Sequence, residues 1–183
     1  MSYDLLIKDA RICDGTGKPT FRGSVGVSGG KIVEVGEASG SATRTINADG
    51  LVLAPGFIDI HTHYDAQVSW DPLLTCSPWH GVTSVLMGNC GVGVAPCRPQ
   101  EKDIVSWDLV NVEAMPQDVL LNGVAWEEWE SFPQYMSAIQ KRGVGLNVGF
   151  LVPLSSFRYY VMGAEASERE ATPDELGRMT TLF

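Results

Sequence analysis

The sequence predicts an α/β fold, in which a small β-rich portion precedes the first part of a parallel barrel. Apolar residues make up 44% of the 183 residues, a globular proportion that can form a sizeable core. Short apolar runs separated by glycine turns fill residues 1–54, as expected for half-buried antiparallel strands. From residue 55 onward, continuous apolar runs alternate with long helical stretches, and this pattern is typical of a parallel sheet.

The N-terminal portion, residues 1–54, is predicted to consist of short strands. Gly29 and Gly30 interrupt an alternating apolar run, which is a hairpin signal because glycine readily adopts the backbone angles of tight turns. Pro55 and Gly56 end this pattern. The expected strands lie within residues 3–13, 23–36 and 45–54.

The second portion, residues 55–183, is predicted to be the first part of a barrel. Ser131 is a helix N-cap candidate, and Thr172 with Glu175 forms a capping-box pattern. A complete (β/α)8 barrel takes about 250 residues. Because the last helix has barely begun at Phe183, we expect an N-terminal part of a longer protein. Buried strands are expected over residues 57–60, 82–89 and 144–152, and helices over 103–110, 115–122, 131–140 and from 173.

The charge of the chain excludes several classes of partner. Its 22 acidic and 13 basic side chains give a formal net charge of −9, and the basic residues are scattered. Nucleic acids are bound through clustered Lys and Arg, so neither nucleic acid nor anionic membrane is expected. The sequence has no run of about 18 apolar residues and no signal-peptide pattern, which predicts a cytoplasmic protein. Its four irregularly spaced cysteines are expected to be reduced thiols.

Two histidines and a cysteine follow neighbouring predicted strands. His61 and His63 are two residues apart, so their side chains leave the same face of a strand and can address one ion. Cys90 ends the next strand between Gly88 and Gly91, and the carboxyl ends of parallel strands lie together. Thiolate and imidazole suit zinc, so these three residues predict a metal site. The alternatives are histidines that cap the strand end and a cysteine that packs as a structural thiol.

Several motifs in the chain resemble a known family. Residues 55–63 (PGFIDIHTH) look like the first-strand motif of the amidohydrolase superfamily. Residues 81–83 (GVT) and 88–91 (GNCG) narrow the resemblance to its N-acyl-D-amino-acid deacylase, or D-aminoacylase, branch. The resemblance covers essentially the whole chain and includes residues 3–17, 111–136 and 155–163.

This resemblance implies a metal-dependent TIM-like (β/α)8 barrel and a small β-sandwich, of which residues 1–54 would form half. His61 and His63 match the histidines that hold the more exposed, weakly occupied metal of the family. Cys90 matches the cysteine that ligates zinc in this branch. Two further histidines and a catalytic aspartate are expected beyond Phe183. The resemblance therefore implies one tight Zn²⁺ site and allows a second, weak one.

The implied reaction is hydrolysis of an N-acyl-D-amino acid to a D-amino acid and a carboxylate. In the family mechanism, zinc polarises the amide and activates water, and the aspartate transfers the proton. No catalytic residue is expected within this chain, which should be inactive alone. Two alternatives stay open: a hydrolase of cyclic amides or other acylated amines in the same superfamily, and a non-catalytic truncated remnant. The sequence does not predict the oligomeric state.

Four further residues bear on the site. Leu154 stands where the resemblance leads us to expect a histidine, so substrate or chemistry can differ from a standard D-aminoacylase. Arg158 could pair with a substrate carboxylate through its planar guanidinium, or form a structural ion pair. Asp65 could orient a metal ligand through a hydrogen bond, or be a solvated loop carboxylate. Glu113 is similar to Asp65 and is left out of the predicted site.

Overall fold

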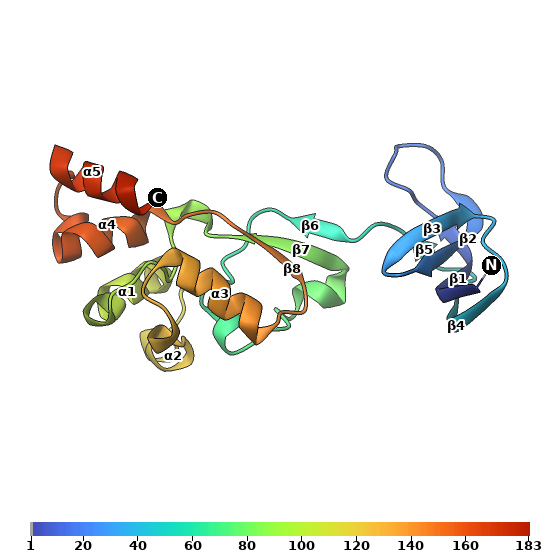
Figure 1. Ribbon diagram of the computed structural model, residues 1–183, viewed down its shortest axis with the longest axis horizontal. Helices are drawn as coiled ribbons and strands as arrows, with labels where there is room; N and C mark the ends of the chain where they lie inside the picture. Colours follow the sequence, from blue (N-terminus) through green and yellow to red (C-terminus); the bar gives the residue numbers. More distant parts are fainter. Residues whose placement is uncertain (1) are drawn as a thin grey trace. The chain divides into compact units, whose positions relative to one another are not determined.

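The computed structural model describes residues 2–183, which divide into two compact units, one that ends at Gly56 and one that comprises Phe57–Phe183. Each unit contains its own β-sheet, and the strands and helices are labelled in Figure 1. Within the described part of the chain, no helix is long and apolar enough to cross a membrane.

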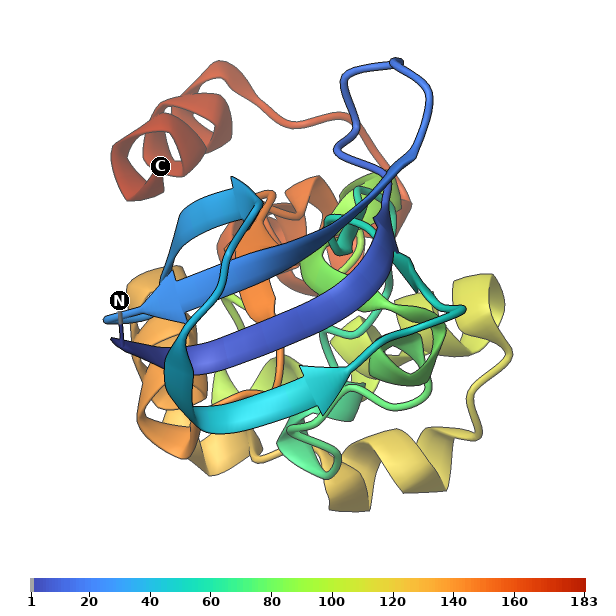
Figure 2. The ribbon, with the colours of Figure 1, turned by 90° about the vertical axis from the view of Figure 1, so that its right-hand side faces the viewer.

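The first unit is a five-stranded sheet in the order β3-β2-β1-β4, with β5 also paired to β1. Strands β2 and β3 form an antiparallel hairpin that turns at Gly29 and Gly30, which both have positive φ, as the sequence predicts. Figure 2 shows the long strand β1 between β2 and β4. The strands are β1 (Ser2–Ile12), β2 (Phe21–Ser28), β3 (Lys31–Gly36), β4 (Ser41–Asn47) and β5 (Val52–Leu53).

The single strand expected over residues 45–54 is wrong, because a turn divides it into β4 and β5. The side-chain oxygen of Asn47 accepts a hydrogen bond from the Asp49 N–H at 3.1 Å, and Gly50 has φ +80°. This local bond offers the backbone an alternative to the ladder. After the turn, the chain pairs with β1 again, further along the same strand.

The second unit has a parallel sheet in the order β6-β7-β8. Along the chain, three α-helices lie between β7 and β8, and two follow β8. Ser131 and Thr172 cap α3 and α5 in capping boxes with Gln134 and Glu175, which confirms the two expected helix starts. Side chains of β7 and of all five helices form one buried cluster. The elements are β6 (Phe57–Asp59), β7 (Val82–Met87), α1 (Lys102–Glu113), α2 (Gln117–Gly123), α3 (Phe132–Arg142), β8 (Asn147–Phe150), α4 (Leu154–Met162) and α5 (Pro173–Leu182).

The prediction that residues 57–60 form a strand buried on both faces is wrong for this chain. Phe57, Ile58 and Ile60 are 65%, 69% and 69% exposed. Strand β6 lies at the edge of the sheet and pairs with β7 alone, and it contributes no residue to the buried cluster of the unit. A continuous apolar run therefore indicates a strand that can be buried, whereas its burial depends on what packs against it.

Helix α4 has no counterpart among the predicted elements. Tyr159, Tyr160 and Val161 have only modest helix propensity, and no side chain caps the helix at Pro153. Packing stabilises the helix instead, because its inward side chains are buried against the rest of the unit. The buried residues of α4 are Ser156, Phe157, Tyr159, Val161 and Met162.

Candidate metal centre

His61 and His63 lie just beyond the end of β6, in a segment that still follows the neighbouring strand. Between them, the Thr62 N–H and hydroxyl both donate to the Leu86 carbonyl of β7, at 3.1 and 2.8 Å. Thr62 is thereby buried toward β7. Because neighbouring side chains in extended backbone point to opposite sides, the two histidines both turn away from Thr62, toward a common space.

Cys90 lies on the short 3-10 helix η3 (Asn89–Gly91), immediately after β7. Gly88, Cys90 and Gly91 all have positive φ, of 81°, 56° and 75°. The side-chain amide of Asn89 donates to the Leu86 carbonyl at 2.8 Å, which holds the turn against the end of the strand. The prediction that the flanking glycines permit a tight backbone at Cys90 is confirmed.

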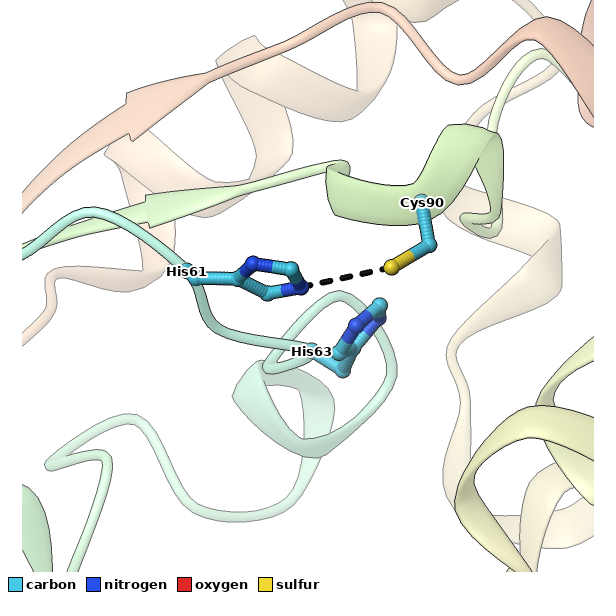
Figure 3. A group of neighbouring side chains, drawn as sticks. All are labelled: His61, His63 and Cys90. Atoms are coloured by element: carbon cyan, nitrogen blue, oxygen red, sulfur yellow. Dashed lines mark hydrogen bonds between the residues drawn. The ribbon is translucent and has the colours of Figure 1, made fainter.

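The structure brings His61, His63 and Cys90 together (Figure 3). Nε2 of His61 lies 3.2 Å from Sγ of Cys90, and one donor atom from each of the three residues lies within 4.8 Å of the other two. Zinc binds nitrogen at about 2.0–2.1 Å and sulfur at about 2.3 Å, so two tetrahedral ligand atoms lie roughly 3.3–3.8 Å apart. Small side-chain rotations would therefore bring all three donors around one ion.

The imidazole of His63 has a polar neighbour that does not belong to the predicted site. Nε2 of His63 lies 3.6 Å from Oε1 of Glu113, the last residue of α1. Nδ1 of the same ring is buried and has no hydrogen-bond partner among the described residues. A ring with an unpartnered nitrogen in this cluster fits a metal ligand better than a strand cap. No spacing rule links residues fifty positions apart, so the sequence alone carries no signal for this contact.

Asp65 is 3% exposed, which excludes the alternative of a solvated loop carboxylate. Its Oδ2 accepts a hydrogen bond from the Gly88 N–H at 3.2 Å, at the start of the turn that carries Cys90. Burial raises the pKa of the Asp65 carboxyl to about 7, and the charge of Glu113 acts in the same direction. The structure thus places Asp65 between the histidine segment and the cysteine turn.

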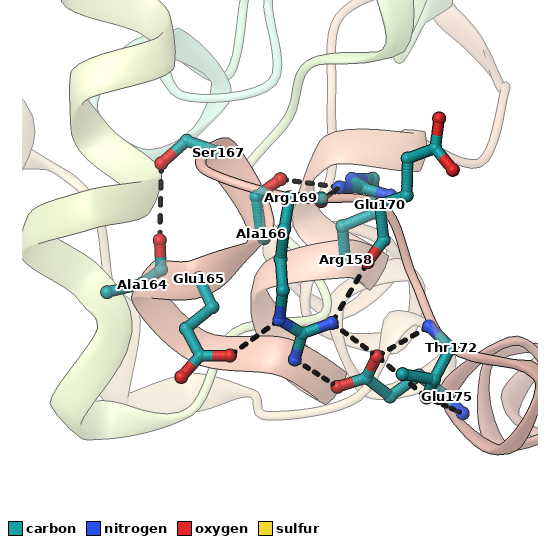
Figure 4. Close-up of polar contacts among 9 residues, drawn as sticks. All are labelled: Arg158, Ala164, Glu165, Ala166, Ser167, Arg169, Glu170, Thr172 and Glu175. Carbon is teal, nitrogen blue, oxygen red and sulfur yellow. Dashed lines mark hydrogen bonds and ion pairs between the residues drawn. The ribbon is translucent and has the colours of Figure 1, made fainter.

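Arg158 is engaged elsewhere (Figure 4). Its guanidinium donates to the carbonyls of Ala166 and Arg169, at 2.5 and 2.8 Å. Arg169 in turn forms ion pairs with Glu165 and Glu175, and its guanidinium holds the pKa of the Glu175 carboxyl well below its usual range. Arg158 therefore has a structural contact, but not the expected ion pair: among the described residues it forms none, and its Nη2 instead bonds to backbone carbonyls of the segment that joins α4 to α5.

Leu154 lies beside the candidate centre. It is the first residue of α4 and is 63% exposed. A methyl group added at Gly91, next to Cys90, would lie 3.8 Å from Cβ of Leu154. The residue that departs from the expected histidine therefore presents an apolar surface next to the turn that carries the thiol.

This arrangement defines a class: α/β proteins in which metal-ligating residue types gather at the carboxyl ends of parallel strands. Residues 44–183 match the model of the Amidohydrolase family, Amidohydro_3, and the chain belongs to this family. The D-aminoacylase of Alcaligenes xylosoxydans xylosoxydans is 34% identical over 98% of this chain and 34% of its own length. The N-acyl-D-aspartate deacylase of the same organism is 33% identical, also over 98% of this chain and 34% of its own length.

Solved structures agree with this family assignment. The N-acyl-D-glutamate deacylase from Bordetella bronchiseptica, described in complex with zinc and a phosphonate inhibitor that mimics the tetrahedral intermediate, superposes with a TM-score of 0.80. The two sequences are 29% identical, and the matched region comprises all of this chain and 35% of the deacylase chain. The mixed α/β fold therefore matches that of the deacylases. The chain spans about a third of the length of the curated relatives.

Proposed function

We propose that this chain is the N-terminal part of a zinc-dependent amidohydrolase that converts N-acyl-D-amino acids to a D-amino acid and a carboxylate. The observation that carries the proposal is the convergence of His61, His63 and Cys90 at the ends of two parallel strands. Whole-chain similarity to deacylases of N-acylated D-amino acids supports the substrate class. Residues 1–54 would contribute half of a small β-sandwich, and residues 55–183 the first strands of a (β/α)8 barrel.

The three clustered residues would hold the metal ion. Two imidazoles and a thiolate form a donor set that favours zinc over hard cations such as Mg²⁺. When bound, the ion would polarise the scissile carbonyl and lower the pKa of a water molecule. The proposal includes one tight zinc site and leaves room for a second, weak one.

Other residues of the chain would orient the ligands. Asp65 would act through the Gly88 N–H, and thereby fix the turn that presents Cys90. Arg158 has no part in the proposal, because its Nη2 is bonded to two backbone carbonyls of its own unit. The general base would be an aspartate outside these 183 residues, so catalysis would need the longer protein.

The reaction is tested with the purified longer protein that contains this chain, after it has been loaded with Zn²⁺. Release of free amine is measured from N-acetylated D-amino acids and from their L-enantiomers, and ring opening of hydantoins is measured as the N-carbamoyl amino acid that it forms. We expect turnover of the D-enantiomers that is lost with a chelator and restored by zinc. Turnover of hydantoins alone would favour the cyclic-amide alternative. No turnover of any substrate would favour the non-catalytic alternative.

Thiol labelling at neutral pH tests the metal site separately. Cys76 and Cys90 are exposed, so both are expected to react with iodoacetamide. Added Zn²⁺ should protect Cys90 and leave the labelling of Cys76 unchanged. Cys97 should stay unlabelled until the protein unfolds, because burial raises the pKa of its thiol to about 12. Peptide mass spectrometry measures each site, and equal labelling of Cys90 with and without zinc would contradict the assignment.

A further inference from the structure

Glu113 is a second acidic residue, besides Asp65, that lies near the candidate metal centre, and it faces His63. The two side chains approach to 3.6 Å and are 28% and 13% exposed, so both are largely shielded from solvent. We propose that Glu113 is a positioning residue, which fixes the ring of His63 for metal binding. This inference rests on the proposed metal site.

The position of Glu113 on its helix supports this inference. Glu113 is the last residue of α1, and the last turn of the helix contains no basic residue. A carboxylate at a helix C-terminus interacts unfavourably with the helix dipole. The placement of Glu113 therefore does not stabilise α1, and its contact with His63 offers a reason for an acid at this position.

The helix can hold Glu113 in a fixed place. Val105 and Leu109 of α1 are completely buried in the core of the unit, and α1 packs against α2 and α4. The anchored helix therefore holds the backbone of Glu113 in a fixed place, within reach of His63. This differs from Asp103 at the start of the same helix, whose side chain is exposed.

The ring of His63 needs such a contact. Nδ1 is buried without a hydrogen-bond partner among the described residues, so the protein does not hold the ring through that nitrogen. A carboxylate that faces one nitrogen of a ligating histidine fixes the ring orientation and makes the ligand more basic. The present 3.6 Å is longer than a hydrogen bond, and a rotation of the Glu113 side chain can shorten it.

Metal affinity tests the inference in the purified protein. Competition between the protein and a chromophoric chelator measures Zn²⁺ affinity for the unaltered protein, Glu113→Ala, Glu113→Gln and Asp103→Asn. We expect Glu113→Ala to weaken binding about 10–100-fold, the usual cost of losing such a partner. Glu113→Gln should be weakened less, because its amide oxygen still accepts a hydrogen bond. Asp103→Asn removes one negative charge from the same helix and should bind as the unaltered protein does.

A spectroscopic measurement separates positioning from loss of folding. The visible absorption bands of bound Co²⁺ report ligand geometry, and we expect them to shift in Glu113→Ala while circular dichroism stays unchanged. Unchanged affinity and unchanged bands in Glu113→Ala would overturn the inference and leave the metal site intact. Equal weakening in Glu113→Gln and Asp103→Asn would also overturn it, because net charge would then explain the effect. Failure of the unaltered protein to bind Zn²⁺ or Co²⁺ would instead overturn the proposed function.

Discussion

Replacement of both His61 and Cys90 with alanine is expected to abolish zinc binding and the proposed hydrolysis together. Nε2 of His61 and Sγ of Cys90 lie 3.2 Å apart, and they are two of the three donors in the cluster. Loss of a residue that only hydrogen-bonds to a metal ligand already lowers the metal affinity about 10–100-fold. Loss of two ligands should lower it far more. Zinc per protein after dialysis, measured by atomic emission, and amine release together check this result.

A matched control is available within the same unit. Cys76 and His80 are both exposed and lie outside the cluster. The double variant of Cys76 and His80 to alanine removes the same two residue types, and it should keep both zinc and activity. If the variant of His61 and Cys90 retains one zinc per protein, the ligand assignment is refuted.

Gly88→Ala is expected to have the second large effect, on stability and on zinc affinity. Gly88 has φ +81°, and a methyl group there would lie 2.0 Å from the Leu151 carbonyl oxygen. A left-handed conformation costs a residue other than glycine about 1–2 kcal/mol, and overpacking adds about 1–3 kcal/mol. We therefore expect a loss of about 2–5 kcal/mol in the free energy of unfolding. Because Gly88 begins the turn that carries Cys90, zinc affinity should fall as well.

Gly81→Ala separates the two causes. Gly81 has the same left-handed conformation as Gly88, with φ 84° and ψ 12° against 81° and 18°. Its added methyl group would lie in ordinary contact with the Phe57 ring, at 3.5 Å, so it meets the conformational cost alone, about 1–2 kcal/mol. Denaturant unfolding of both variants measures the difference in free energy of unfolding. Equal losses in the two variants would show that the close approach to Leu151 does not matter.

Several features of the fold could be predicted because they depend on neighbours in the sequence. The hairpin at Gly29 and Gly30 and the helix starts at Ser131 and Thr172 are confirmed. Each depends on the backbone preference of glycine or on a side chain that bonds to the backbone three residues away. Interactions of this range are encoded in a few consecutive residues.

The approach of the three candidate ligands was also predictable, for a different reason. The spacing of His61 and His63 places both on one side of an extended segment. The parallel arrangement of neighbouring strands then brings Cys90 to the same edge of the sheet. Regular geometry extends a local pattern across two strands, so the contact does not depend on the details of packing.

Other features depended on contacts that no local pattern encodes. The exposure of Ile58, the helix from Leu154 to Met162 and the burial of Asp65 follow from what packs against each segment. The approach of Glu113 to His63 depends on where α1 docks on the unit.

The sequence by itself determined the strand-end motif, the caps and the donor chemistry, because these are properties of residue type and short spacing. The tertiary structure alone decided which acidic side chains support the donors and which apolar runs are covered. Burial and long-range polar contacts arise from the simultaneous packing of segments far apart in the chain, and a strand or helix pattern does not show which distant side chains will pack against it.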